Sequence, residues 1–296
     1  MDEPAQSGEH RRSFTTGGSA RARLFVGRLV TGALESVRGF PPGTWLHRRL
    51  QRQLEVTETD VVLRRGAPGL DGLRLVFLSD VHAGFYQTAE DLAALGRRVR
   101  DLAPDLVCLG GDLVATRPAD IDLLGSLLEP LDPPLGIHAV LGNHECFYLD
   151  AGVEPFVRTL REAGVRLWIN GGERLELAGA SLWLAGIDDA CTGTPDLERA
   201  LAGARPDEPV LLLSHIPDYL RSLPRGAVDL VLAGHTHGGQ VRLAGHAPIT
   251  HSSHGYEMGL YEFEGTQLFV SRGVGVSALP IRIGVRSEVA LLRLRR

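Results

Sequence analysis

The chain contains no lysine, and all 31 of its basic residues are arginine. This absence excludes enzymes that use a lysine as a nucleophile or to form a Schiff base. Cysteine is also scarce, and Cys108, Cys146 and Cys191 have no paired spacing. They form no disulfide framework, and the composition suits a reducing compartment such as the cytoplasm.

Long apolar runs are missing as well. No stretch of about 18 apolar residues occurs, so the sequence predicts no helix that spans a membrane. Hydrophobic residues nevertheless make up 44% of the 296 residues, which is enough to bury a large core. The net charge is −5, and this acidic balance argues against nucleic acid as the main partner.

Positive charge is concentrated at the N-terminus, where residues 1–65 contain 11 arginines against 7 acidic residues. We expect a disordered tail over residues 1–20 and a basic amphipathic segment over residues 21–60. Residues 21–54 either contact an anionic membrane surface peripherally or pack on the following domain. Both surroundings suit basic amphipathic helices beside Trp45.

The stretch from Arg11 to Phe14, Arg-Arg-Ser-Phe, resembles a twin-arginine export signal. Such a signal is followed by an uncharged apolar stretch, and here three arginines between residues 21 and 28 interrupt it. We therefore favour a location in the cytoplasm or at the periphery of the membrane over export.

Residues 61–296 read as one domain in which strand and helix patterns alternate, until strand follows strand in the last third. The pattern predicts a mixed α/β fold, a sandwich of two β-sheets flanked by helices. The expected strands are 73–79, 105–109, 136–141, 165–169, 182–187, 209–214, 228–233, 260–264, 267–271 and 288–294. The expected helices are 88–102, 119–130, 151–163, 195–202 and 217–222.

The apolar run from Leu73 to Ser79 ends in Asp80 and His82. A run of this kind is typical of a buried strand, and ligands bind at the carboxyl ends of strands in open α/β sheets. Asp80 and His82 are two residues apart, so in extended backbone both side chains leave on the same side. An oxygen and a nitrogen ligand directed at one point form half of a metal site.

Four further apolar runs end in residues that can bind metals. Most of these ends begin with glycine, which lets the backbone turn sharply and brings short side chains to one centre. The residues concerned are Gly110-Gly111-Asp112, Gly142-Asn143-His144-Glu145, Ser214-His215 and Gly234-His235-Thr236-His237. Turn preference explains one such end but not five in one chain. The sequence therefore predicts a shared metal site.

Taken in order, these five motifs resemble those of the calcineurin-like metallophosphoesterases, over about residues 70–295. The resemblance implies a four-layer αββα sandwich of two mixed β-sheets flanked by helices, with residues 61–296 as the catalytic domain. It also implies an enzyme, a metal-dependent hydrolase of phosphoric esters.

The resemblance implies a role for each motif residue. It assigns three ligands to each of two divalent ions: Asp80, His82 and His237 to the first, and Asn143, His215 and His235 to the second. Asp112 would bridge both ions. His144 would lie beside the ions, either as proton donor to the leaving oxygen or as a positive clamp on the phosphate.

The chemistry of such a site follows from its ligands. Two divalent ions about 3.5–4 Å apart can hold a bridging hydroxide and polarise a phosphoryl group for in-line attack. A shared carboxylate suits two cations at that distance, because its negative charge offsets their repulsion. Imidazole and amide ligands suit Mn, Fe or Zn, and the choice among these metals stays open.

Some residues depart from other branches of the family. Ala115 stands where purple acid phosphatases carry a tyrosine ligand, which disfavours an iron–tyrosinate site. Residues 113–117 lack the Asp-Arg-Gly of protein serine/threonine phosphatases, which disfavours a phosphoprotein substrate. Glu145 replaces the Asp that often follows the catalytic histidine, and it would orient His144 if its greater length allows.

Motifs after His237 look like those of a bacterial membrane-associated branch that is similar to the UDP-2,3-diacylglucosamine pyrophosphatases. They are Gly238–Arg242, Gly259–Tyr261, Ser271–Gly273 and Pro280–Arg282. This similarity favours cleavage of a phosphodiester or pyrophosphate in a nucleotide-linked lipid, and hence a role in lipid metabolism. The alternatives are a soluble phosphodiesterase of cyclic or small nucleotides and a catalytically silent metal-binding scaffold.

Candidates for contacts with the substrate, a phosphorylated small molecule or a lipid head group, are Arg242, His251, His254, Arg272 and Arg282. The planar donor set of arginine suits phosphate. Pairing with the chain's excess carboxylates is an equal alternative for the arginines, and loop histidines are usually solvated. No protein partner is evident.

Overall fold

The computed structural model describes residues 53–148, 154–177, 179–248, 250–277 and 280–296, together with Pro42, Trp45 and Arg49. The predicted tail and most of the predicted basic segment therefore lie outside the described residues. Among the described residues, no helix combines the length and the apolar character needed to cross a bilayer.

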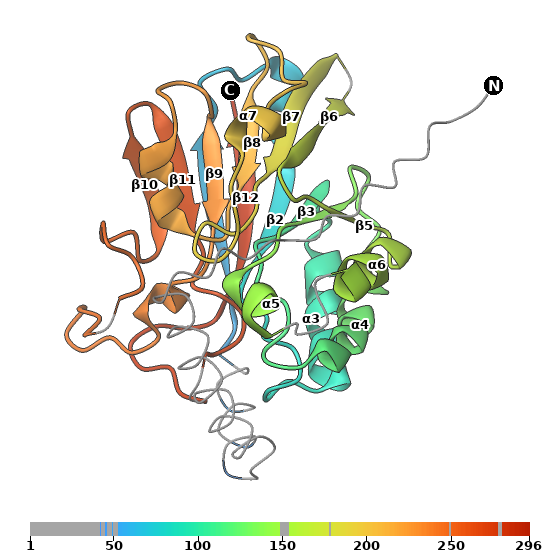
Figure 1. Ribbon diagram of the computed structural model, residues 1–296, viewed down its shortest axis with the longest axis vertical. Coiled ribbons are helices and arrows are strands. Elements are labelled where there is room, and N and C mark those ends of the chain that lie inside the picture. The colour runs from blue at the N-terminus through green and yellow to red at the C-terminus, as the bar shows by residue number, and fades with distance from the viewer. Residues whose placement is uncertain are drawn as a thin grey trace. The chain divides into compact units, whose positions relative to one another are not determined.

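The first β-sheet has six strands in the order β1-β12-β2-β3-β4-β5 (Figure 1). They are β1 (Glu55–Val62), β2 (Arg74–Leu78), β3 (Leu106–Leu109), β4 (Ile137–Ala139), β5 (Val165–Leu167) and β12 (Glu288–Arg295). Strands β2 to β5 are parallel, β12 is antiparallel to β2, and β1 pairs in parallel with β12 at the edge. The carboxyl ends of β2, β3 and β4 consequently meet at one edge of the sheet.

The second β-sheet also has six strands, in the order β10-β11-β9-β8-β7-β6. They are β6 (Gly171–Leu177), β7 (Ala180–Gly186), β8 (Val210–Leu213), β9 (Leu230–Ala233), β10 (Gly259–Phe263) and β11 (Thr266–Val270). The four inner strands are parallel, and β6 and β10 are antiparallel to their neighbours. Both sheets are therefore mixed.

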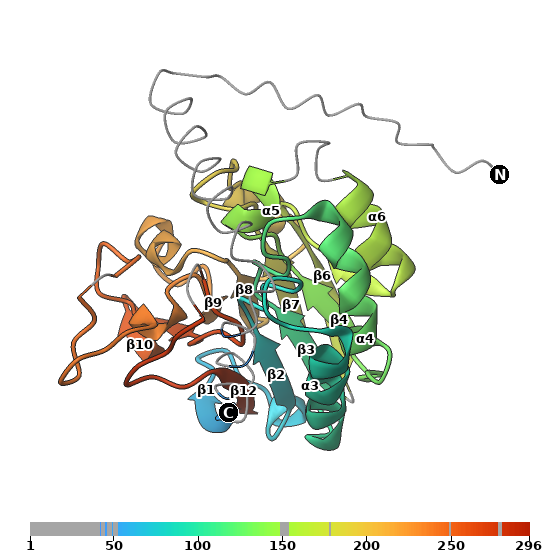
Figure 2. The same ribbon diagram turned by 90° about the horizontal axis from the view of Figure 1, so that it is seen from below.

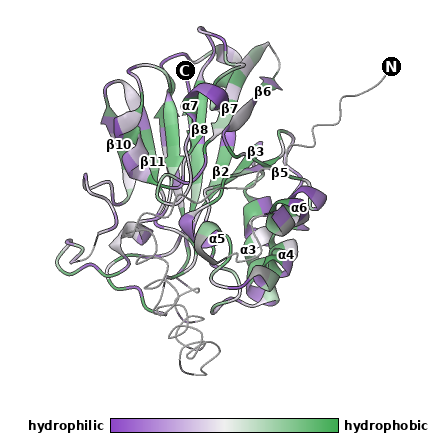
Figure 3. Cartoon of the chain, in the orientation of Figure 1, coloured by the Kyte–Doolittle hydropathy of each residue, from purple (hydrophilic) through white to green (hydrophobic). Residues whose placement is uncertain are grey.

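Apolar residues on both faces of each sheet determine the layers. In β2, Phe77 belongs to the cluster between the two sheets, together with Leu213 and Leu232 of the second sheet. Val76 and Leu78 belong to the cluster on the opposite face, because successive side chains alternate along a strand. Figure 3 shows that hydrophobic residues concentrate on the strands.

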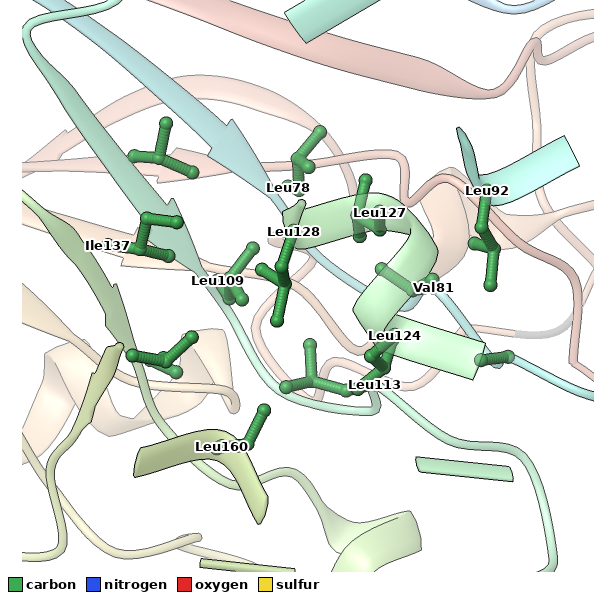
Figure 4. Packing of buried hydrophobic residues seen from close by; sticks show 14 of the residues in the cluster. Leu78, Val81, Leu92, Leu109, Leu113, Leu124, Leu127, Leu128, Ile137 and Leu160 are labelled. Carbon is green, nitrogen blue, oxygen red and sulfur yellow. The ribbon is translucent and has the colours of Figure 1, made fainter. Parts of the chain in front are cut away.

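Helices cover the outer face of the first sheet (Figure 2). They are α3 (Ala89–Asp101), α4 (Leu124–Leu128) and α6 (Glu154–Glu162). Leu92, Leu127 and Leu160 from these helices pack in one cluster with Leu109 of β3 (Figure 4). The helix α3 begins with a capping box, in which Thr88 accepts a hydrogen bond from Asp91 N and Asp91 accepts one from Thr88 N.

Shorter elements cover the outer face of the second sheet. These are α7 (Leu197–Ala200) and the 3-10 helix η3 (Pro217–Ser222). Ala200 and Leu220 pack there against Leu212 and Val231. The four layers confirm the predicted αββα sandwich. Other helices among residues 53–296 as described are α5 (Asn143–Tyr148) and the 3-10 helices η1 (Pro68–Leu70), η2 (Pro118–Leu123) and η4 (His237–Gly239).

Every strand expected from the sequence has a counterpart, but β1, β6 and α5 were not expected. The strands β1 and β6 lie at sheet edges and are only partly buried, so they lack a continuous apolar run. The strand β1 moves the start of the first sheet to Glu55, inside the segment predicted as 21–60. The helix α5 has only six residues, too few for a visible period.

Leu109 tests the packing of the first sheet against its helices, because its side chain is 1% exposed. We expect Leu109→Ala to lower the free energy of unfolding by roughly 2–5 kcal/mol through lost burial and a cavity. Leu260 on β10 is 43% exposed and provides the control. Leu260→Ala should change the free energy of unfolding by less than about 1 kcal/mol. Urea unfolding followed by circular dichroism measures both. Equal losses in the two variants would contradict this placement of the core.

Candidate metal centre

The segments after β2 and β3 run side by side beyond the end of the sheet. Asp80 N donates to Gly111 O at 3.0 Å, and His82 N donates to Asp112 O at 3.0 Å. These hydrogen bonds extend the parallel pairing of the two strands into the loops. The side chains of Asp80, His82 and Asp112 are thereby brought to one edge. Figure 1 shows α5, which carries Asn143 and His144, at the opposite end of the sheets from the marked C-terminus.

Five of the seven predicted metal ligands have a left-handed backbone. Their φ angles are 54° at Asp80, 49° at His82, 51° at Asp112, 71° at His235 and 51° at His237. This conformation costs a residue other than glycine roughly 1–2 kcal/mol. Such strain persists where the surrounding structure imposes it, and it is concentrated at functional sites.

The carboxylate of Asp112 is the centre of the cluster. Its Oδ2 atom lies 3.3 Å from Nε2 of His215, 3.8 Å from Nε2 of His82 and 3.9 Å from Nε2 of His144. Gly142 approaches so closely that a Cβ atom there would lie 2.2 Å from Asp112 Oδ1. Although burial opposes ionisation, the charges of His215 and His144 hold the pKa of Asp112 well below its usual value.

On one side of Asp112 lie Asp80, His82 and His237. The Nε2 atoms of His82 and His237 are 3.1 Å apart, and Nε2 of His237 is 3.4 Å from Asp80 Oδ1. Burial and the charge of His144 lower the pKa of His82 to about 3, and burial also lowers the pKa of His237. Both rings are therefore neutral at pH 7, the state in which imidazole binds a metal.

On the other side lie Asn143, His215 and His235. Nδ1 of His215 lies 2.8 Å from Gly110 O, which fixes a proton on Nδ1 and directs Nε2 toward the cluster. That Nε2 atom is 3.2 Å from Asn143 Oδ1. The rings of His215 and His235 are 5.1 Å apart between centroids. Although burial opposes it, Asp112 raises the pKa of His215 well above its usual value. A cation on Nε2 would replace the proton that Asp112 stabilises there.

The backbone holds His235 against Asp80. His235 N donates to both carboxylate oxygens of Asp80 at 3.1 Å. The preceding residue must be glycine, because a Cβ atom on Gly234 would lie 1.8 Å from Ser79 Oγ. These contacts join the carboxyl end of β9 in the second sheet to that of β2 in the first.

The donor set fits divalent cations. Ligand atoms lie within 4.8 Å of one another in three overlapping groups, which are Asp80 with His82 and His237, His82 with Asp112 and His144, and Asp112 with His215 and His235. Asn143 adds an amide oxygen beside the last group. The carboxylates of Asp80 and Asp112 are buried, and buried carboxylates need a compensating positive charge.

His144 lies at the edge of this cluster. Its backbone N–H donates to Asp112 Oδ1 at 2.9 Å, and its side chain is 14% exposed. The ring is oriented by the carbonyl oxygen of Ala115, which lies 2.6 Å from Nδ1. Glu145, expected to perform this task, turns its carboxylate to backbone N–H groups of residues 112–114.

The three arginines predicted to contact substrate are held by the chain itself. Arg242 contacts Glu257 and the carbonyl oxygens of Gly238 and Gly245. Arg272 contacts Glu55 and Glu288. Arg282 donates to the carbonyl oxygens of His237, Gly273 and Gly275. Arg242 and Arg272 thus make the carboxylate pairs that the sequence left open as an alternative. Arg282 is buried and ties the backbone of His237 to the neighbouring loop.

The two loop histidines have different positions. The ring of His251 lies 5.5 Å from that of His235 between centroids, so it borders the cluster. His254 instead lies beside Asp218, with Nδ1 and Oδ2 3.6 Å apart, and stacks on Tyr256. The structure therefore brings His251 to the site and places His254 in a different set of contacts.

Sequence reasoning missed Asp189, which lies in the loop after β7 and is 1% exposed. Its Oδ2 atom accepts hydrogen bonds from Thr192, while Oδ1 has no hydrogen-bond partner among the described residues. Burial raises the pKa of Asp189, and the charge of His215 opposes this rise. Asp189 follows an apolar run, as the predicted ligands do, but Ile187 and Asp188 separate it from Gly186 at the end of β7, and no histidine lies near it in the sequence.

Comparisons with known proteins agree with this geometry. The family model described as calcineurin-like phosphoesterase matches residues 73–239. The uncharacterized metallophosphoesterase YkuE of Bacillus subtilis is 30% identical over 290 residues, which cover 96% of this chain and 97% of that protein. A transmembrane protein with metallophosphoesterase domain from Bos taurus is 33% identical over 259 residues, and these span 81% of this chain but only 57% of that protein.

Among solved structures, a dimetal phosphatase from Danio rerio is similar with a TM-score of 0.42 and 14% identity, covering 69% of this chain and 88% of that chain. The ordered motifs, the two-sheet sandwich and the extent of the family match lead to one assignment. The chain belongs to the calcineurin-like metallophosphoesterase family and is a metal-dependent hydrolase of phosphoric esters.

Proposed function

We propose that this enzyme hydrolyses a phosphodiester or pyrophosphate bond at a centre of two divalent ions. One ion would be held by Asp80, His82 and His237, the other by Asn143, His215 and His235, and Asp112 would be shared. When bound, the ions would activate water and polarise the phosphoryl group. The nitrogen and oxygen donors suit Mn, Fe or Zn.

The position of Asp112 is the observation that carries this proposal. Its Oδ2 atom faces Nε2 of His82 on one side and Nε2 of His215 on the other, at 3.8 Å and 3.3 Å. A carboxylate between two sets of imidazole nitrogens has the position that a ligand shared by two cations requires. The left-handed backbone at Asp112 supports the same role, because strain of this kind is retained for function.

Burial indicates the side from which a substrate would approach. Asn143, His144 and His235 are half-buried, whereas the other predicted ligands are buried. The exposed ring of His251 extends this half-buried side beyond His235. We infer that the phosphoryl group is bound between His144 and His235, with His251 in contact with the rest of the substrate.

Hydrolysis adds the oxygen of water to phosphorus, breaks the bond to the leaving oxygen and leaves that oxygen in need of a proton. The contact with Ala115 O fixes the Nδ1 proton of His144 in place, so Nε2 is the atom that faces the substrate. A protonated Nε2 would donate to the leaving oxygen or neutralise charge on the phosphate. Either role makes His144 a catalytic residue that does not hold a metal.

A lipid-linked substrate is supported by two exposed apolar side chains near the site. Leu243 is 61% exposed and Ile283 is 48% exposed. Arg242 N donates to Ile283 O, so the two loops that carry these side chains are paired. The neighbouring Arg282 contacts His237 O, which links the pair to the metal centre. An acyl chain of a nucleotide-linked lipid such as UDP-2,3-diacylglucosamine would cover this apolar pair.

The transmembrane relative from Bos taurus is a second reason to consider a substrate at a membrane, which residues 21–54 would contact peripherally. A soluble phosphodiesterase of cyclic or small nucleotides is the competing enzyme, and it leaves the exposed apolar pair without a role. A silent scaffold is disfavoured, because the cluster retains the predicted ligands together with His144.

Two variants separate metal binding from proton transfer. Asp112→Asn should lose both ions and nearly all turnover of bis-p-nitrophenyl phosphate with Mn²⁺, because the shared charge is gone. His144→Ala should keep the metal content and lose roughly 10²–10⁴-fold in kcat. The exposed His246 provides the control, and His246→Ala should match the wild type. Unchanged turnover in His144→Ala would remove this residue from the mechanism.

A substrate panel tests the lipid. We expect kcat/KM to be higher for UDP-2,3-diacylglucosamine than for cyclic nucleotides or phosphomonoesters. Replacing both Leu243 and Ile283 by serine should lower kcat/KM for the lipid by about 30-fold, since two buried apolar contacts of roughly 1 kcal/mol each are lost. The same double variant should leave bis-p-nitrophenyl phosphate turnover unchanged. A preference for cyclic nucleotides that the double variant retains would support the soluble phosphodiesterase instead.

A further inference from the structure

Glu145 has an unusual set of hydrogen-bond partners. Its side chain is fully buried, and its two carboxylate oxygens accept hydrogen bonds from four backbone N–H groups. Oε1 accepts from Leu113 and Val114 at 2.7 Å and 3.0 Å. Oε2 accepts from Asp112 and Gly142 at 3.0 Å and 2.8 Å. Four donors match the number of lone-pair sites that a carboxylate offers.

The four N–H donors belong to the two loops that position the predicted ligands Asp112 and Asn143. The loop after β3 contains Asp112, and its Ala115 carbonyl orients the ring of His144. The loop after β4 contains Gly142, directly before Asn143. Glu145 itself lies in the first turn of α5, so one side chain fastens both loops to this helix.

The backbone strain and the close contact of these two loops explain why the hydrogen bonds to Glu145 are needed. Asp112 has a left-handed backbone, which the loop does not favour on its own. A Cβ atom on Gly142 would lie 2.2 Å from Asp112 Oδ1, so the two loops are in direct contact and leave no room for a side chain there. The hydrogen bonds from Asp112 N and Gly142 N to the same oxygen of Glu145 hold the loops at this distance.

We propose that Glu145 is a positioning residue, which fixes the loop of residues 112–115 against Gly142. The Asp112 carboxylate and the His144 ring thereby keep the orientations that the metal centre requires. This inference rests on the proposed function, because it takes Asp112 as the shared ligand and His144 as the catalytic histidine. Glu145 touches neither the substrate nor the reacting atoms. Its effect is transmitted by backbone hydrogen bonds to the two residues that do.

A merely structural role is the competing explanation, and Glu208 provides the matched control. Glu208 is also a buried carboxylate, and each of its oxygens accepts two hydrogen bonds. It precedes β8, at the end of the strand away from His215. Gln at either position exchanges an oxygen that accepts two hydrogen bonds for an NH₂ group, so both substitutions disrupt a buried carboxylate whose hydrogen bonds are all made.

The experiment compares Glu145→Gln, Glu145→Asp and Glu208→Gln with the wild type. Three quantities are measured for each: the free energy of unfolding of the metal-free protein, the Kd for Mn²⁺ by competition with a fluorescent chelator, and turnover of bis-p-nitrophenyl phosphate. We expect both Gln variants to lose stability by similar amounts. Only Glu145→Gln should raise the Kd for Mn²⁺, by roughly 10–100-fold, as loss of a partner behind a metal ligand does.

Glu145→Asp keeps both acceptor oxygens and shortens the side chain by one methylene group. We expect a Kd for Mn²⁺ between those of the wild type and Glu145→Gln, and this variant carries the test if the Gln variant does not fold. A Glu145→Gln protein with wild-type Kd and turnover, and with a stability loss equal to that of Glu208→Gln, would overturn the proposal.

A crystal structure of metal-free Glu145→Gln separates this inference from the proposed function. Displacement of Asp112 and Ala115 from their wild-type positions supports the positioning role, even if the wild-type protein proves inactive toward every diester tested. An unmoved loop overturns the positioning role and leaves the proposed function intact.

Discussion

The site depends on one buried carboxylate, that of Asp112. Nitrogen atoms of His82, His144 and His215 surround its Oδ2 atom, and Oδ1 accepts the N–H of His144. A buried anion is costly unless positive charge compensates it. Among the described residues, Arg282 is the buried arginine of this region, and its guanidinium is used by backbone carbonyls. The arrangement therefore has the electrostatics of a site built for cations.

The two sheets supply the rigidity that this arrangement needs. Parallel strands end at one edge, and hydrogen bonds from Asp80 N and His82 N continue their pairing into the loops. The left-handed residues turn the side chains inward, at an energetic cost that the packed core between the sheets offsets. The second sheet contributes His215 and His235 from the ends of β8 and β9. The centre consequently forms only when both sheets are packed.

The fold and the clustering of the motif residues could be predicted from the sequence, because both follow from local patterns of apolar and polar residues. An apolar run of four or five residues marks a buried strand, and a glycine followed by Asp, Asn or His marks its end. The strands β1 and β6 escaped this reasoning because an edge strand needs no continuous apolar run. The acceptor of the His144 ring escaped it for another reason. Ala115 acts through its carbonyl oxygen, which every residue possesses.

The arginines show a second limit of prediction from sequence, because residue type alone does not reveal which groups a side chain contacts. Arg242, Arg272 and Arg282 have the right chemistry for phosphate, yet Glu257, Glu288 and backbone carbonyls bind their guanidinium groups. Because the chain also lacks lysine, charge on a phosphoryl group would be neutralised by the ions and by His144. Selectivity among phosphate esters must then come from groups outside the centre. The loops that carry His251, Leu243 and Ile283 have the exposure to provide it.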